Sequence, residues 1–288
     1  EQTPTGVLGV GNLADNQSNN LFRGTIYIKN GAPGTWLVNE LNLEDYLKGL
    51  GEVPDSWPLE AIKAQVIAAR TYGARRINSP QNAVFDIYDT VQDQVYNGYA
   101  NEAAKPNHVT AINATPGQAI YRDGQLIQAY YSSDSGGATE NNENVWGGSP
   151  INYLRGVNAP WERPDVWSKT VANATIQASY GHPGNVDTIN ILEYYPSGRA
   201  KTIRLITSGG ATTDHNLPAD THRSRLTLRS GKITGIGRSG NDWVFNGRGF
   251  GHGIGLGQWG AYNQANAGRT AVQILTFYYT GVNIGNLY

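Results

Sequence analysis

The sequence lacks cysteine and methionine and contains no long hydrophobic run. Without cysteine, the 288-residue chain can form neither disulfides nor thiolate metal sites. The absence does not tell whether the protein works in an oxidising or a reducing compartment. No run of 18 apolar residues occurs, so no transmembrane helix is expected. Because methionine is missing even at position 1, we expect a mature or trimmed, extracytoplasmic form from which a signal or anchor has been removed.

Charge is also scarce, since only 16% of the residues are charged and the net charge is −1. Such a weak field argues against nucleic-acid binding through phosphates. The apolar content of 39% is enough for a core, and the 36 glycines, 17 tyrosines and 7 tryptophans indicate many turns and an aromatic surface or cleft. We expect a loosely ordered N-terminal extension at 1–20, then a single domain at 21–288 with a β-rich, more variable segment at about 155–235.

The clearest element is a helix from about Pro58 to Arg76. Apolar residues recur there at spacings of three and four, which predicts one buried stripe made of Leu59, Ile62, Val66, Ala69 and Gly73. Arg70 lies beside this stripe. Because an unpaired buried charge is costly, Arg70 must pair with an acid or line a cleft.

Other segments complete an α+β prediction. Strands are expected at 24–29 and 35–43, short helices at 44–50 and 106–113, and hairpins at 119–131, turning at Asp123-Gly124, and at 191–206. A helical run from 258 to about Ala267 ends at Gly268, and Thr270 with Gln273 forms a capping-box pattern for a last helix. We expect a mixed or antiparallel sheet, with a barrel-like form left open, packed against the long helix and the C-terminal helices around a substrate cleft.

Glu52 is the strongest candidate for chemistry. It stands in the otherwise uncharged run 49–54, just before the long helix. A carboxyl held near apolar groups on an irregular turn has a raised pKa, which suits a general acid at neutral pH. The alternative is a first-turn glutamate that favours the helix N-terminus. Asp55 is the nearest acid, and its place beside the helix start suggests capping.

Three other kinds of site are weakly supported. The glycine run at 247–257 lacks the features of a nucleotide-binding loop, and we interpret it as a close backbone approach that sets His252, Gln258 and Trp259 on a cleft wall. A packed glycine turn with His252 bonded to a carbonyl remains the alternative. Neither the five histidines nor the acids at 86–93 form a metal pattern, and the serine at 135 lacks a nucleophile-elbow context.

Four ordered blocks resemble the stage II sporulation protein D family, which includes amidase enhancers. They lie at 46–72, at 88–96, at 133–137 with 145–148, and at 251–261, and the resemblance extends over about residues 24–285. It implies a lytic transglycosylase that cleaves the bond between N-acetylmuramic acid and N-acetylglucosamine in peptidoglycan and leaves a 1,6-anhydro end. The sporulation members prefer glycan stripped of stem peptides by a partner amidase.

The resemblance also implies roles for particular residues. Glu52 would be the general acid and then the base, with Arg70 supporting it and no second carboxylate essential. Some relatives hold zinc with His and Cys near the Ser-Gly-Gly loop, but this chain has no cysteine, so no cofactor is expected. A non-catalytic glycan-binding protein that stimulates an amidase and a hydrolytic muramidase remain the alternatives. The residues expected to bind glycan are Tyr72, Gln94, Tyr96, Ser133, Ser135, Gly136, Gly137, Trp146, His252, Gln258 and Trp259.

Overall fold

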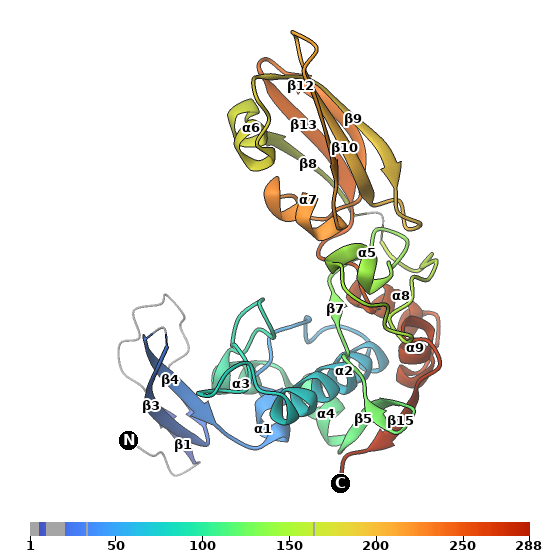
Figure 1. Ribbon diagram of the computed structural model, residues 1–288. Helices are drawn as coiled ribbons and strands as arrows, with labels where there is room; N and C mark the ends of the chain where they lie inside the picture. The colour runs from blue at the N-terminus through green and yellow to red at the C-terminus, as the bar shows by residue number, and fades with distance from the viewer. Residues whose placement is uncertain (1–5, 10–20, 33, 164) are drawn as a thin grey trace. The chain divides into compact units, whose positions relative to one another are not determined.

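The computed structural model describes residues 6–9, 21–32, 34–163 and 165–288, and Figure 1 labels most of its elements. These residues form two compact units. Unit 1 comprises residues 1–129, 268–275 and 282–288, and unit 2 comprises 130–267 and 276–281. Most of the expected extension at 1–20 lies outside the described residues. That residues 21–288 act as one catalytic domain stays a prediction.

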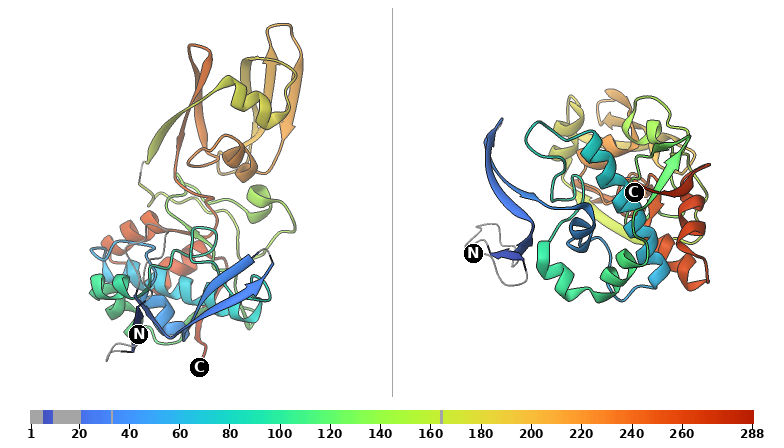
Figure 2. Two further views of the ribbon diagram at one scale, coloured as in Figure 1. Left: turned by 90° about the vertical axis from the view of Figure 1, so that its left-hand side faces the viewer. Right: turned by 90° about the horizontal axis from the view of Figure 1, so that it is seen from below.

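Unit 1 is built around helices. Its helices are α1 (Leu43–Lys48), α2 (Leu59–Asn78), α3 (Gly98–Ala104), α4 (Pro106–Asn113) and the first part of α9 (Ala271–Tyr278). Its strands are β1 (Val7–Gly9), β2 (Leu21–Arg23), β3 (Thr25–Gly31), β4 (Gly34–Glu40), β5 (Gln118–Arg122), β6 (Gln125–Leu126) and β15 (Asn283–Asn286). Figure 2 shows β3 and β4 as a two-stranded ribbon in blue.

Helix α2 is buried over most of its circumference, which is more than the single stripe that the sequence predicts. Every residue from Ala64 to Ala74 is buried, because α1, α4 and β5 contact the helix and its many alanines allow close approach. The prediction was wrong for Leu59, which is 38% exposed because it starts the helix outside this packed middle.

The other predicted elements of unit 1 are largely confirmed. The capping box forms at the start of α9, where Thr270 N–H donates to Gln273 Oε1 at 3.0 Å and Gln273 N–H donates to Thr270 Oγ1 at 3.3 Å. The turn at Asp123 and Gly124 has φ angles of 49° and 75°, as a tight hairpin requires. The second arm of that hairpin is shorter than predicted, because β6 ends at Leu126 and β5 pairs with β15 on its other edge.

Unit 2 holds the sheet-rich core. Its strands are β7 (Tyr131–Ser132), β8 (Val166–Val171), β9 (Val186–Tyr194), β10 (Ala200–Thr207), β11 (Thr212–Asn216), β12 (Ile233–Ser239), β13 (Asp242–Arg248) and β14 (Leu256–Gly257). Its helices are α5 (Asn142–Trp146), α6 (Asn173–Tyr180), α7 (Ala219–Arg225) and α8 (Gln258–Asn266), with the end of α9. The predicted hairpin at 191–206 is confirmed by the antiparallel pairing of β9 with β10.

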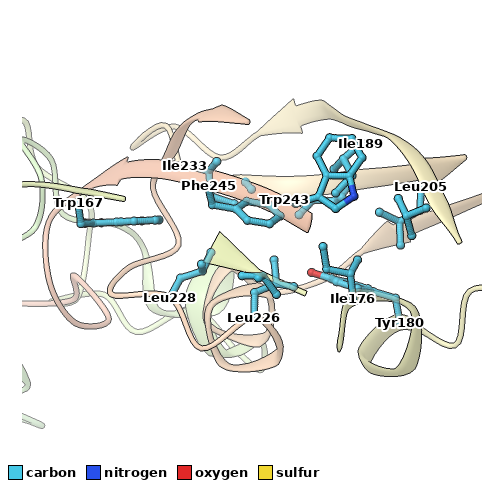
Figure 3. Close-up of a cluster of buried hydrophobic side chains, with 14 residues drawn as sticks. Trp167, Ile176, Tyr180, Ile189, Leu205, Leu226, Leu228, Ile233, Trp243 and Phe245 are labelled. Carbon is cyan, nitrogen blue, oxygen red and sulfur yellow. The ribbon is translucent and has the colours of Figure 1, made fainter. Parts of the chain in front are cut away.

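The core of unit 2 lies between strands and helices. Figure 3 shows side chains of β9, β10, β12 and β13, among them Trp243 and Phe245, above side chains of α6 and of the segment after α7. Phe245 is 1% exposed and Ile176 fully buried. The alternation of buried and exposed residues along β13 gives it one face for this core and one for solvent.

The fold class is α+β, as predicted. The strands within the described ranges form six sheets of two or three strands, and none closes into a barrel. Pairing is antiparallel except between β7 and β14. No helix in the described part of the chain has the length and apolar character needed to span a membrane. The substrate cleft expected between sheet and helices stays a prediction.

Glu162 of unit 2 has a buried carboxyl oxygen. Its Oε1 accepts a hydrogen bond from Tyr278 Oη at 3.0 Å, and Gly257 and Gly260 leave room for it because a Cβ at either position would collide with this pair. Burial, and secondly the negative charge of Asp134, raises the pKa of Glu162 from 4.5 to about 7. The folded chain therefore holds this proton more tightly than the unfolded chain does.

We expect stability to fall as pH rises from about 4.5 to 7. In this window the unfolded chain has released the Glu162 proton while the folded chain still binds it, and above it the folded state must hold a buried carboxylate. The loss amounts to about 3 kcal/mol of unfolding free energy. Glu162→Gln should remove this part of the slope in urea denaturation at pH 5 and 8, whereas Glu193→Gln, at a solvent-exposed acid, should retain it. An unchanged slope in Glu162→Gln would contradict the assignment.

Candidate active site

Glu52 lies on an irregular bend between α1 and α2. It is half-buried, and α2 begins seven positions later at Leu59. The acid in the first turn of α2 is Glu60, so Glu52 is not the first-turn residue considered as an alternative. Its Oε1 accepts a hydrogen bond from the Val95 N–H at 2.8 Å. The bend thus presents a carboxyl that the backbone of a distant segment fixes in place.

Residues 95–97 hold this bend by close backbone pairing. Gly51 N–H donates to Val95 O at 2.8 Å, and Asn97 N–H donates to Gly49 O at 2.8 Å. A Cβ at Gly49 would overlap the Tyr96 ring, and one at Gly51 would overlap the Asn97 side chain. The two glycines before Glu52 are therefore needed for this approach.

A small cavity adjoins Glu52. Its volume is about 10 Å³, on the order of the space that one water molecule occupies. Apolar side chains dominate its wall, so the site disfavours a charged group without polar partners. The lining residues are Leu47, Leu50, Glu52, Gln65, Val66, Ala69 and His108.

Asp55 caps a different helix from the one expected. Its Oδ1 accepts the His108 N–H of α4 at 2.9 Å and lies 3.3 Å from His108 Nδ1. The predicted capping of the following helix was wrong, because α2 has Pro58 at its N-cap and no side-chain cap bond. Lys105, the N-cap residue of α4, makes no side-chain cap bond, so Asp55 accepts from the His108 N–H in the first turn of this helix. These bonds lower the pKa of Asp55 despite the opposing effect of burial, which is the largest single influence on it.

Arg70 pairs with an acid, which is one of the two options predicted. Its guanidinium is fully buried and bidentate to Glu44, with Nε–Oε1 at 2.7 Å and Nη2–Oε2 at 2.8 Å. Its Nη1 donates to Gln118 O at 3.2 Å, and Tyr288 Oη donates to the same Glu44 at 2.6 Å. Arg70 follows the cavity-lining Ala69 on α2, and its bonds to Glu44 and Gln118 fix α2 against α1 and β5. That Arg70 supports Glu52 stays a prediction.

Three residues expected to bind glycan lie inside unit 1. Gln94 is fully buried and accepts from Tyr46 Oη at 3.0 Å, and Tyr96 stacks on Tyr46 with ring centroids 5.3 Å apart. Tyr72 Oη bonds Asp93, whose buried carboxylate also accepts from Arg76 at 2.8 Å. These contacts support the 93–97 segment that holds Glu52. Direct contact of Tyr72, Gln94 or Tyr96 with glycan stays a prediction.

The sequence analysis missed a groove on unit 1. Its volume is about 680 Å³, and it lies between the β3–β4 ribbon and residues 80–89. Trp36, Phe85 and Tyr88 line it as one aromatic cluster, with Phe85 centred 4.9 Å from Trp36 and 4.7 Å from Tyr88. Aromatic residues in a polar, turn-rich stretch were the available signal, but only the fold brings position 36 to position 85.

The Ser-Gly-Gly loop of unit 2 is rigidly held. Asp134 exchanges two backbone hydrogen bonds with Phe250, at 3.0 and 2.8 Å, and the fully buried Arg199 donates to Ser135 O at 3.0 Å. Gly136 and Gly137 have φ angles of 72° and 99°. The close backbone approach expected for the glycine run is observed, since a Cβ at Gly253 would overlap the Arg199 guanidinium. The close approach at Gly253 makes room for the buried Arg199 side chain in unit 2. The placing of His252, Gln258 and Trp259 on a cleft wall stays a prediction.

An aromatic group in unit 2 reaches solvent. Trp146 is 41% exposed, and its ring lies 4.8 Å from that of Tyr130 and 4.9 Å from that of His252. His252 Nδ1 accepts from the Ile254 N–H at 3.0 Å, and the ring also bonds the backbone of Tyr131, as the alternative of a carbonyl-bonded His252 expected. Burial lowers the pKa of His252 to about 4, so its ring is neutral near pH 7.

The remaining predicted residues lie near the Ser-Gly-Gly loop. Trp259 N–H donates to Ser133 O at 3.0 Å, and the Arg163 guanidinium lies 4.1 Å from the Trp259 ring centroid. Gln258, the first residue of α8, is buried. Within the described ranges, no three His, Asp or Glu side chains are grouped in a way that could hold a metal ion.

The fold and the fixed acid of unit 1 define an α+β protein with one candidate acid–base residue, and the comparisons give its family. Residues 32–121 match the family model described as "Stage II sporulation protein". The stage II sporulation protein D of Bacillus subtilis is 30% identical over 86% of this chain and 75% of its own length. The chain belongs to the stage II sporulation protein D family.

Two further relatives extend the comparison. An uncharacterized protein of Brachyspira hyodysenteriae is 35% identical over 86% of this chain and 68% of its own length. The "Amidase enhancer" of Bacillus subtilis is 29% identical over 83% of this chain, which spans 40% of that longer protein.

We expect Arg70→Met to destabilise the protein by roughly 2–4 kcal/mol, because it removes a buried partner and leaves Glu44 without its ion pair. In urea denaturation, Glu44→Gln/Arg70→Met should lose less than the sum of the two single variants. Arg204→Lys, in the exposed pair with Asp214, should leave the midpoint unchanged. Strict additivity of the two single variants would show that the Arg70–Glu44 pair contributes no coupling.

Proposed function

We propose that this protein acts on the bacterial cell wall as a peptidoglycan lytic transglycosylase with Glu52 as its acid and base. The observation that carries the proposal is the placement of Glu52. One carboxyl oxygen accepts the Val95 N–H, which favours the carboxylate, while the adjoining cavity is mostly apolar, which favours the neutral acid. A residue that must act first as acid and then as base benefits from both influences.

The reaction needs only one carboxyl. Glu52 would donate its proton to the glycosidic oxygen as the bond from the muramoyl anomeric carbon to that oxygen breaks through an oxocarbenium-like state. The resulting carboxylate would take the proton of the muramoyl 6-hydroxyl while that oxygen bonds to the anomeric carbon. The 1,6-anhydro product forms without water, and the proton returns to Glu52.

The nearby acids of unit 1 have structural partners. Asp55 caps α4, and the buried Asp93 accepts from Tyr72, Arg76 and the Tyr88 N–H. A retaining glycosidase would need a second carboxyl about 5–5.5 Å away, and an inverting one roughly 6.5–9.5 Å away. The engagement of both acids supports a mechanism with Glu52 alone.

A second function is favoured by two observations. The "Amidase enhancer" relative carries a name that describes stimulation of an amidase, and Trp146 exposes a ring on which a pyranose could stack. Under this alternative, the protein binds glycan outside the cytoplasm and stimulates a cell-wall amidase without cleaving the strand. Both functions use the same glycan, so the products of digestion distinguish them.

We expect wild type to release anhydromuramoyl ends from purified peptidoglycan, more readily after an amidase has removed the stem peptides, and Glu52→Gln to release none. Mass spectrometry of both digests reads the result. Glu60→Gln is the matched control, because that glutamate lies on α2 and its amide can still accept the Ala271 N–H. Reducing ends would indicate a hydrolase, and no cleavage of either substrate would favour the binding protein.

Trp146→Ala should weaken the binding of stripped glycan about two- to tenfold, the effect of losing one aromatic contact of 0.5–1.5 kcal/mol. Co-sedimentation with insoluble glycan measures the loss. Tyr194→Ala removes a ring of similar exposure from β9 and serves as the control. Equal binding by both variants would place the glycan contact elsewhere.

A further inference from the structure

His108 is buried beside Glu52 with one ring nitrogen engaged and the other not. It is 3% exposed and lines the same small cavity as Glu52. Its Nδ1 lies 3.3 Å from Asp55 Oδ1, whereas no atom of the described residues forms a hydrogen bond with Nε2. Such a buried polar atom is costly unless the site gives it a partner at some stage.

The contact with Asp55 fixes the tautomer of His108. The pKa of Asp55 is lowered, so its carboxylate is ionised and can only accept hydrogen bonds. Nδ1 must therefore carry the proton that faces Asp55. Burial, and then the charge of Lys105, lowers the pKa of His108 and keeps the ring neutral. A neutral ring protonated at Nδ1 has a lone pair at Nε2.

That lone pair lies where an acid could use it. His108 lines the cavity of Glu52, and Asp55, the partner of Nδ1, does not, which suits a cavity reached from the Nε2 side of the ring. His108 and Glu52 line the same cavity, whose volume of about 10 Å³ is on the order of the space that one water molecule occupies. Three groups that can carry charge lie near His108: Glu52, Asp55 and Lys105, whose ammonium donates to Val53 O at 3.0 Å. The nearby Tyr46 hydroxyl donates to Gln94.

We propose that His108, oriented by Asp55, is a positioning residue that accepts a hydrogen bond at Nε2 from the protonated Glu52 carboxyl, directly or through one water, and so holds Glu52 as an acid. The proton stays on Glu52, because the buried ring disfavours a charge of its own. The role in catalysis rests on the proposed function, but the effect on the Glu52 proton does not.

The test compares two amide variants. The amide of His108→Asn can occupy the place of Nδ1 and still donate to Asp55, but it lacks the acceptor at Nε2. His108→Gln places an amide near Nε2. We expect the alkaline limb of the pH–rate profile to move about 0.5–1 pH unit lower in His108→Asn, the effect of one neutral hydrogen bond, and His108→Gln to recover most of the shift.

Titration of the Glu52 carboxyl by ¹³C NMR gives a readout that needs no activity, and the same downward shift is expected there. His222→Asn is the control, because that buried histidine in unit 2 has both ring nitrogens bonded, to Tyr180 and to Lys201 O. A Glu52 titration identical in wild type and His108→Asn would overturn the proposal, even with altered stability. If the titration shifts but no variant cleaves glycan, the proposal on His108 holds and the proposed enzyme fails.

Discussion

The pairing of residues 49–52 with residues 95–97 is the constraint on which the candidate site depends. It places two backbone segments at hydrogen-bonding distance and directs the Val95 N–H onto the Glu52 carboxyl. Side chains at positions 49 and 51 would prevent this approach, so both glycines follow from it. An irregular bend alone would leave Glu52 free to rotate. Here the Val95 N–H holds Oε1 of the carboxyl, and the adjoining cavity wall is mostly apolar.

Two ion pairs, each with one fully buried partner, fix the elements that carry residues 49–52 and 95–97. Arg70 fixes α2 against α1 through Glu44, and Asp93, in the segment that holds Glu52, is bonded to Arg76 and Tyr72 of the same helix. A buried pair contributes little net stability when both partners are present, but removal of one partner is costly. Such pairs therefore fix geometry more than they add free energy, and geometry is what a general acid requires.

Sequence reasoning succeeded where structure is determined by near neighbours. The long helix, the capping box at Thr270, the Asp123 turn and the hairpin at 191–206 all follow from residues a few positions apart. It failed where a partner is distant in the chain. Nothing near Asp55 indicates that α4, about fifty residues later, lacks a cap, and nothing near Trp36 indicates that Phe85 packs against it.

The same limit applies within the candidate site. Glu52 was identifiable because an acid in an apolar run is unusual locally, and Arg70 because a charge beside a buried stripe requires a partner. His108 gives no local signal, since a single histidine on a short helix is ordinary. Its relevance depends on facts that only the fold supplies: burial, a carboxylate at Nδ1, an unbonded Nε2 and a place on the wall of the cavity that Glu52 also lines.

A single carboxyl that acts first as acid and then as base must be able to exist both as the protonated acid and as the carboxylate. The Val95 N–H stabilises the carboxylate, whereas the apolar wall and an acceptor at His108 favour the protonated acid. A second fixed cation beside Glu52 would oppose proton retention. Arg70 on α2 is instead paired with Glu44, and burial lowers the pKa of Lys105. The proposed exchange of a proton at Glu52 is then governed by its own neighbours, the Val95 N–H and the cavity wall.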